Sequence, residues 1–67
     1  MKLDEFNSCD EQQASAHFQR CCGSRVWVQQ MVARRPFDTA ASLLSAATTV
    51  WLGLTEADWL EAFAAHP

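Results

Sequence analysis

Apolar residues recur every three or four positions in four short stretches of this 67-residue chain, and no stretch alternates apolar with polar residues. The first spacing matches one face of an α-helix, whereas a half-buried strand would need alternation. The chain has only two glycines, and the connections between the stretches are short. The pattern therefore predicts an all-α fold, a bundle of about four helices packed against their neighbours in sequence.

Capping and breaking residues delimit the first two helices. Ser8 with Glu11 three residues later fits a capping box, so we expect the first helix to begin after Ser8. Gly23 is expected to end this helix, and Ser24 to cap the second. Pro36 is expected to end the second helix, because the residue before a proline is kept out of the helical conformation.

The last two helices carry similar signals. Asp38 or Thr39 is expected to cap the third helix, and Gly53 lies near its end. Thr55, followed three residues later by Asp58, is expected to begin the fourth helix.

The apolar positions of each helix define the expected core. They are Ala14, Phe18 and Cys21; Trp27, Val28, Met31 and Val32; Leu43, Ala47, Val50 and Leu54; and Trp59, Leu60, Phe63 and Ala64. Core packing explains Trp27, Trp51 and Trp59 better than an aromatic stacking platform does. Hydrophobic residues make up 49% of the chain, which is much for so small a domain. We therefore expect some of this surface to face a partner or a missing half.

Charge and composition exclude several classes of protein. The net charge of −3 argues against nucleic-acid binding, and Arg34-Arg35 is too short to form a basic patch. No stretch approaches the 18 or so apolar residues of a membrane span, and the polar start does not resemble a signal peptide. Three cysteines, two of them adjacent, indicate free thiols in a reducing compartment, so we expect a cytoplasmic protein.

Cys9, His17, Cys21 and Cys22 form one candidate cluster, since several lie at helical spacings. A zinc-binding helical domain is the weakest alternative, because zinc ligands usually come in pairs two to four residues apart. We expect buried thiols, a surface histidine and no metal.

Two further clusters have structural explanations. Glu56, Asp58 and Glu61 could supply a general acid and base, but acids in a first helical turn commonly cap the helix and complement its dipole. Arg34 and Arg35 could bind a carboxylate, although arginines in a last turn more often complement the carbonyl end.

The sequence "DWLEAFAAHP" ends on His66 and Pro67. Pro67 favours an extended backbone at His66, so the imidazole would leave the helix in a restricted direction. The carbonyl end of the preceding helix would favour the protonated ring, as a proton donor requires.

An ordered set of motifs carries a family resemblance: "CCGS" at 21–24, "RPF" at 35–37, "AA" at 46–47 followed by Trp51, and "WLEAFAAHP" at 59–67. From "FN" at 6–7 onward, the chain resembles the 2-oxo-4-hydroxy-4-carboxy-5-ureidoimidazoline (OHCU) decarboxylases. These uric acid degradation enzymes form (S)-allantoin.

The resemblance implies a cofactor-free decarboxylase in which His66 is the catalytic proton donor and Pro67 lines the substrate site. It also implies that residues 1–67 are the N-terminal part of one all-α domain. An "RIG"-like stretch and Ser, Glu and Arg site residues would follow in a C-terminal half, and the enzyme would form a homodimer. The main alternative is a small non-catalytic helical module that binds a partner through apolar faces.

Overall fold

Five helices and no strand make up residues 2–65, the part of the chain that a computed structural model describes. Met1, His66 and Pro67 lie outside the described residues. The all-α prediction is confirmed, and all four predicted helices are present. A short helix that the sequence did not predict precedes them. The helices are α1 (Leu3–Ser8), α2 (Glu11–Cys21), α3 (Arg25–Ala33), α4 (Ala40–Leu52) and α5 (Glu56–Ala64).

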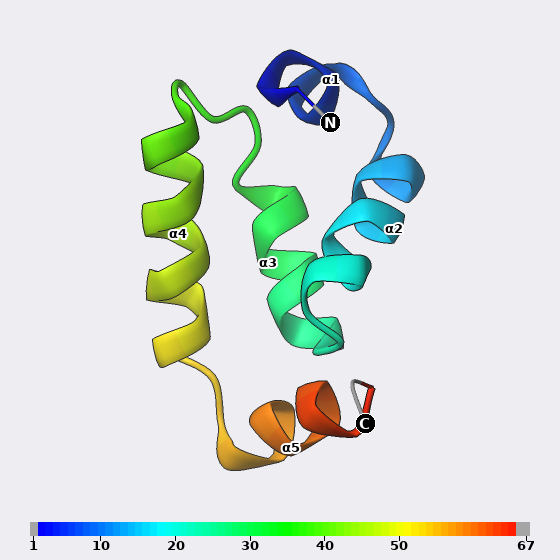
Figure 1. Cartoon of the computed structure of the whole chain (residues 1–67), viewed down its shortest axis with the longest axis vertical. Coiled ribbons are helices and arrows are strands. Elements are labelled where there is room, and N and C mark those ends of the chain that lie inside the picture. The colour runs from blue at the N-terminus through cyan, green and yellow to red at the C-terminus, as the bar shows by residue number, and fades with distance from the viewer. Residues whose placement is uncertain (1, 66–67) are drawn as a thin grey trace.

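Helix α3 is the central element of the fold. It lies between α2 and α4 and packs against both, and α5 crosses beneath one end of it (Figure 1). Helix α1 lies at the opposite end of the molecule (Figure 1). This arrangement brings the turn between α2 and α3 close to the C-terminal end of α5, although these segments are far apart in sequence.

The predicted start of α2 is wrong by two residues. Ser8 is not a cap: it ends α1, and its hydroxyl donates to the Asp4 carbonyl at 2.8 Å. Asp10 caps α2 instead, with its carboxylate accepting from the Gln13 amide at 2.8 Å and the Gln13 side chain accepting from the Asp10 amide. Asp10 and Gln13 have the same spacing as the expected capping box.

The predicted end of α2 at Gly23 is wrong, because the helix ends at Cys21 and the backbone is already extended at its cap, Cys22. The other predicted caps are confirmed. Ser24 accepts a hydrogen bond from the Trp27 amide at the start of α3, and Thr39 accepts one from Ser42 at the start of α4. Helix α3 ends at Ala33, before the proline, and Gly53 is the C-terminal cap of α4.

The core forms where α2, α3 and α4 meet. Its fully or almost fully buried apolar side chains are Ala14, Phe18, Trp27, Val28, Met31, Phe37, Val50 and Leu54. The Phe18 ring packs 5.0 Å from the Phe6 ring and edge-on against Trp27 at 5.7 Å between centroids. The Trp27 indole also donates to the Ala47 carbonyl at 3.1 Å, which links α3 to α4 without leaving a buried donor unpaired.

Two side chains attach α1 to the segment before α4. The Asn7 amide group donates to the Phe37 carbonyl at 2.8 Å and accepts from the Phe37 amide at 2.9 Å. The Arg35 guanidinium donates to the carbonyls of Phe6 and Cys9 at 2.8 and 2.7 Å. Arg35 thus satisfies carbonyls at the end of α1, which are left without helical partners.

Not every predicted core position is buried. Cys21 is exposed, because it lies in the last turn of α2, and Val32, Leu43 and Ala47 are half-buried. Of the predicted face of α5, Trp59 is half-buried, whereas Leu60, Phe63 and Ala64 are exposed. The buried residue of α5 is Ala62 instead. Helix α5 thus contacts the rest of the fold mainly through Ala62 and Trp59, and leaves Leu60 and Phe63 exposed.

Substituting two phenylalanines should therefore have unequal effects in the 67-residue chain. Phe18 is 2% exposed and Phe63 is 63% exposed. Phe18→Ala should cost about 3–5 kcal/mol, as much as the whole stability expected of a core this small, ~3–5 kcal/mol. We expect Phe18→Ala to lose most of the helical circular dichroism signal that the wild-type chain shows, whereas Phe63→Ala should keep it. Equal losses in both variants would contradict this description of the core.

Candidate functional site

The sequence-predicted site residues, His66 and Pro67, lie outside the described residues. Ala65, the C-terminal cap of α5, is the described residue that precedes them in the chain. The structure therefore shows how α5 is held up to the residue before His66. It does not bear on the predicted roles of His66 and Pro67.

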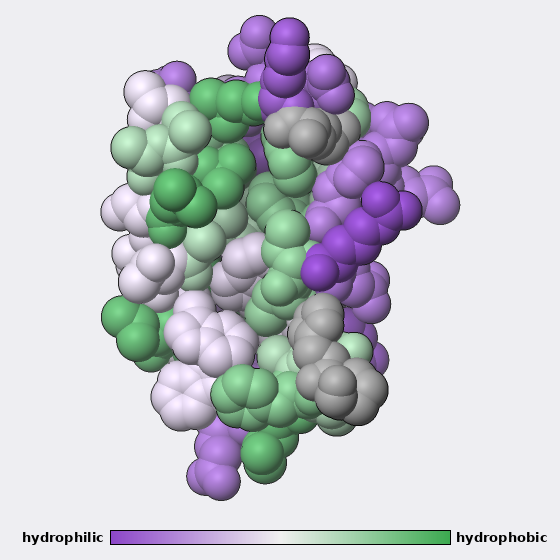
Figure 2. All heavy atoms as spheres, in the orientation of Figure 1, coloured by the Kyte–Doolittle hydropathy of each residue, from purple (hydrophilic) through white to green (hydrophobic). Residues whose placement is uncertain are grey.

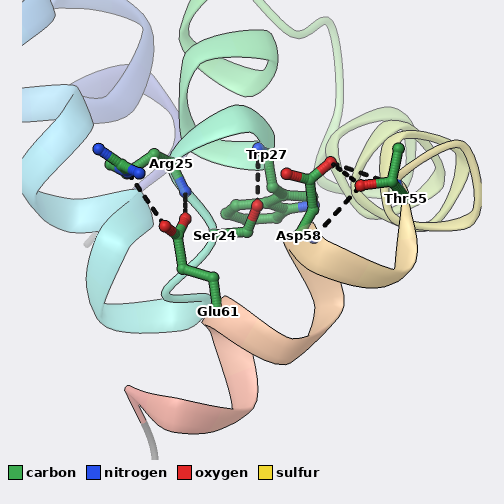
Figure 3. Close-up of polar contacts among 6 residues, drawn as sticks. All are labelled: Ser24, Arg25, Trp27, Thr55, Asp58 and Glu61. Carbon is green, nitrogen blue, oxygen red and sulfur yellow. Dashed lines mark hydrogen bonds and ion pairs between the residues drawn. The ribbon is translucent and has the colours of Figure 1, made fainter.

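The start of α5 is fixed by the predicted capping box. The Thr55 hydroxyl accepts from the Asp58 amide at 3.3 Å, and the Asp58 carboxylate accepts from the Thr55 amide at 3.2 Å and hydroxyl at 3.0 Å (Figure 3). Asp58 is thus committed to capping, as the structural explanation of the acidic cluster anticipated.

Glu61 joins α5 to the first residue of α3. Its carboxylate accepts from the Arg25 backbone amide at 2.7 Å and from the Arg25 Nε at 3.1 Å (Figure 3). The backbone amide is one of the donors that a helix N-terminus leaves unpaired. Its hydrogen bond, aided by the Arg25 guanidinium, holds the pKa of Glu61 below its ordinary value despite opposing desolvation. This contact joins residues 36 positions apart, and no local pattern predicts it.

Gly23 provides the second contact with the end of α5. It is buried against the backbone of Ala62 and the side chain of Ala65. A methyl group on residue 23 would overlap the Ala65 methyl carbon, so the two segments can approach this closely only if residue 23 has no side chain. Together, Gly23 and Arg25 hold the last two turns of α5.

An apolar hollow of about 400 Å³ lies beside this contact. Its lining residues come from α2, α3, α4, α5 and the turn after α2: Cys21, Cys22, Trp27, Ala47, Thr48, Trp51, Ala62 and Phe63. The Trp51 ring packs edge-on against Phe63 at 6.1 Å between centroids. On the face drawn in Figure 2, hydrophilic side chains collect over α2, whereas hydrophobic ones spread over α4 and α5. This apolar lining suits other apolar side chains better than a charged metabolite.

Trp51 and Trp59 are half-buried, and both pack against the core. Their rings lie 6.2 Å apart, and the Trp59 indole donates to the Trp51 carbonyl at 2.9 Å. The core interpretation is therefore confirmed fully for Trp27 and in part for the other two.

The proposed zinc ligands do not converge. Across residues 2–65, no group of three or more His, Cys, Asp or Glu side chains is arranged to hold a metal ion. Cys21 is exposed, and Cys9 and Cys22 are half-buried. The prediction that all three thiols are buried is therefore wrong. His17 is half-buried and packs edge-on against Phe6 at 5.7 Å.

The family model of OHCU decarboxylase matches residues 7–67 of this chain. No curated protein matches, and no solved structure does. The match covers nearly the whole chain, so the chain belongs to the OHCU decarboxylase family, whose members are cofactor-free decarboxylases. Separately, none of the helices in residues 2–65 has the length and apolar character needed to cross a membrane.

The Glu61–Arg25 contact should make stability depend on pH. Because the pKa of Glu61 is lower in the folded state, the contact contributes fully above the pKa of an unfolded glutamate, roughly 4.3. The contribution is lost as the pH falls through the folded-state value. Between pH 7 and pH 3, the free energy of unfolding should fall more in the wild type than in Glu61→Gln.

Arg25→Ala is the informative control for this experiment. It removes the guanidinium but keeps the backbone amide, which is the largest cause of the lowered pKa. This variant should therefore retain part of the pH dependence. The same fall in wild type and Glu61→Gln would show that the contact does not form.

Proposed function

We propose that this chain contributes the proton donor of an OHCU decarboxylase, which converts 2-oxo-4-hydroxy-4-carboxy-5-ureidoimidazoline to (S)-allantoin. The observation that carries the proposal is the family match, because it extends over His66 and Pro67. In this proposal, His66 donates the proton and Pro67 lines the substrate site.

The substrate itself can accept the electrons that decarboxylation releases. The bond from the ring carbon to the carboxylate breaks, and carbon dioxide leaves. The electron pair passes into the neighbouring carbon–nitrogen double bond, so the intermediate is stabilised within the ring. The protein then has to hold the carboxylate and hydroxyl in position and deliver one proton to one face of the ring. Positioning and general acid catalysis are sufficient for these tasks.

The surroundings of α5 are consistent with a proton donor at residue 66. The last turn of α5 contains no basic residue, so its carbonyl end would favour a protonated imidazole in the residues that follow. The hydrogen bonds of Glu61 and the packing of Ala65 on Gly23 hold the end of the helix from which His66 continues.

We further propose that residues 1–67 are the N-terminal part of one all-α domain whose remaining helices cover the apolar hollow. Four large apolar side chains are at least 58% exposed: Leu44, Leu52, Leu60 and Phe63. Phe63 lines the hollow directly. A non-catalytic interaction module would show the same exposed apolar surface, so this surface is expected for either function.

His66→Asn should separate catalysis from binding. In the natural protein, we expect the variant to fold and to keep much of its substrate affinity. Its rate should fall by about 10²–10⁴-fold, because asparagine can hydrogen-bond but cannot donate a proton as an acid. Optical rotation, followed as freshly generated substrate becomes (S)-allantoin, gives the rate. The uncatalysed decay yields racemic product.

Two results would contradict the proposal at different levels. An unchanged rate and stereoselectivity in His66→Asn would exclude His66 as the proton donor. A wild type that fails to accelerate the reaction would exclude the activity and favour the interaction module.

Phe63→Ala tests whether further helices cover the hollow. If further helices cover Phe63 in the complete natural protein, Phe63→Ala should lower the free energy of unfolding by about 3–5 kcal/mol, as Phe18→Ala should. Urea denaturation of both variants measures the two costs under the same conditions. A cost below about 1 kcal/mol for Phe63→Ala would mean that the hollow stays open.

A further inference from the structure

We infer that Gly23 and Glu61 are positioning residues for the proton donor, because residues 23–25 form a seat that fixes the direction in which the chain leaves α5. This inference rests on the proposed role of His66. It adds two residues that contact neither the substrate nor the transferred proton.

One of the two contacts that hold the end of α5 is steric. Ala65 immediately precedes His66 in the chain, and its methyl group occupies the space that a side chain on residue 23 would need. The Ala65 amide also donates to the Glu61 carbonyl at 3.2 Å, so the residue continues the helical geometry of α5. Any side chain at position 23 would therefore displace the backbone from which His66 continues.

The other contact that holds the end of α5 is polar. The Glu61 carboxylate makes two hydrogen bonds to Arg25, at 2.7 and 3.1 Å. One contact alone would leave α5 free to rotate about it. Glu61 and Ala65 are four residues apart and lie on the same side of the helix. Both contact residues 23–25, so the two contacts together restrict rotation and sliding of the last turn.

The seat itself is held rigidly. Ser24, between Gly23 and Arg25, is fully buried, and its hydroxyl caps α3 by accepting from the Trp27 amide at 3.2 Å. The turn that receives α5 is therefore attached to the central helix of the core. A displacement of about 1 Å at a proton donor can lower the rate by about 10²-fold. Attaching the turn at residues 23–25 to the central helix would limit such a displacement.

The steric test uses a compensating pair of variants in the complete natural protein. Gly23→Ala should lower kcat by about 10- to 100-fold with a smaller change in KM, because the proton donor is displaced while the rest of the site remains. Adding Ala65→Gly removes the overlapping methyl group and should restore most of kcat. Ala65→Gly alone measures the effect of added backbone freedom.

The polar test uses Glu61→Ala, Glu61→Gln and a control on the same helix. Glu61→Ala should lower kcat more than it changes KM, whereas Glu61→Gln keeps an acceptor for the Arg25 amide and should recover most of the rate. Glu56→Ala should leave both constants unchanged, because Glu56 is exposed and away from the seat. Rates are expressed per folded molecule, from circular dichroism, so that a loss of stability alone does not lower them.

The outcomes distinguish this inference from the proposed function. Two results would support the positioning roles. Adding Ala65→Gly would restore kcat to the Gly23→Ala variant, and Glu61→Gln would have a much higher kcat than Glu61→Ala. An active wild type with equally active Gly23→Ala and Glu61→Ala variants would overturn the inference alone. Variants that only lose stability, with kcat per folded molecule unchanged, would overturn it too. A wild type without acceleration would overturn both, because no proton donor would then be positioned.

Discussion

The close contact between Gly23 and Ala65 determines how near α5 can approach the turn between α2 and α3. It requires a residue without a side chain directly before the cap of α3, and a small residue at the end of α5. Ser24 and Arg25 then follow in fixed order, one capping α3 and the other binding Glu61. Directly after Cys22, the C-terminal cap of α2, three consecutive residues thus cap α3, begin it and contact the end of α5.

The core and the apolar surface have complementary roles. Phe18, Trp27 and Met31 are buried where the central helix α3 packs against its neighbours. The turn at residues 23–25, which begins α3, is therefore attached to the core. The outward faces of α4 and α5 remain hydrophobic, and the hollow between them lies next to the end of α5.

Sequence reasoning predicted the fold class and most helix boundaries because these depend on residues three or four positions apart. Ser24, Thr39 and Thr55 cap their helices as expected. The prediction at Ser8 was wrong because α1 is too short to show a clear apolar period, so the sequence did not indicate that Ser8 lies within a helix. For α5, periodicity identified an apolar face correctly but could not say that its small side, through Ala62, is the buried one.

The contacts that bear on the candidate site could not be predicted from local patterns. Arg25 and Glu61 are 36 positions apart, and nothing in either neighbourhood indicates the other. Gly23 was assigned only to the end of a helix, whereas its close packing against Ala65 depends on the crossing of α5 beneath α3. His66 and Pro67 were identified through the order of the family motifs. The family match includes both residues.

A nuclear Overhauser effect between the Gly23 α-protons and the Ala65 methyl protons would show whether α5 is seated on residues 23–25. The account predicts a strong effect, because the Ala65 methyl occupies the space beside the Gly23 α-carbon. The ring contact between Phe18 and Trp27 serves as an internal reference for a folded core. If that ring contact were observed without the Gly23–Ala65 effect, α5 would not be seated on residues 23–25, and the account would be wrong.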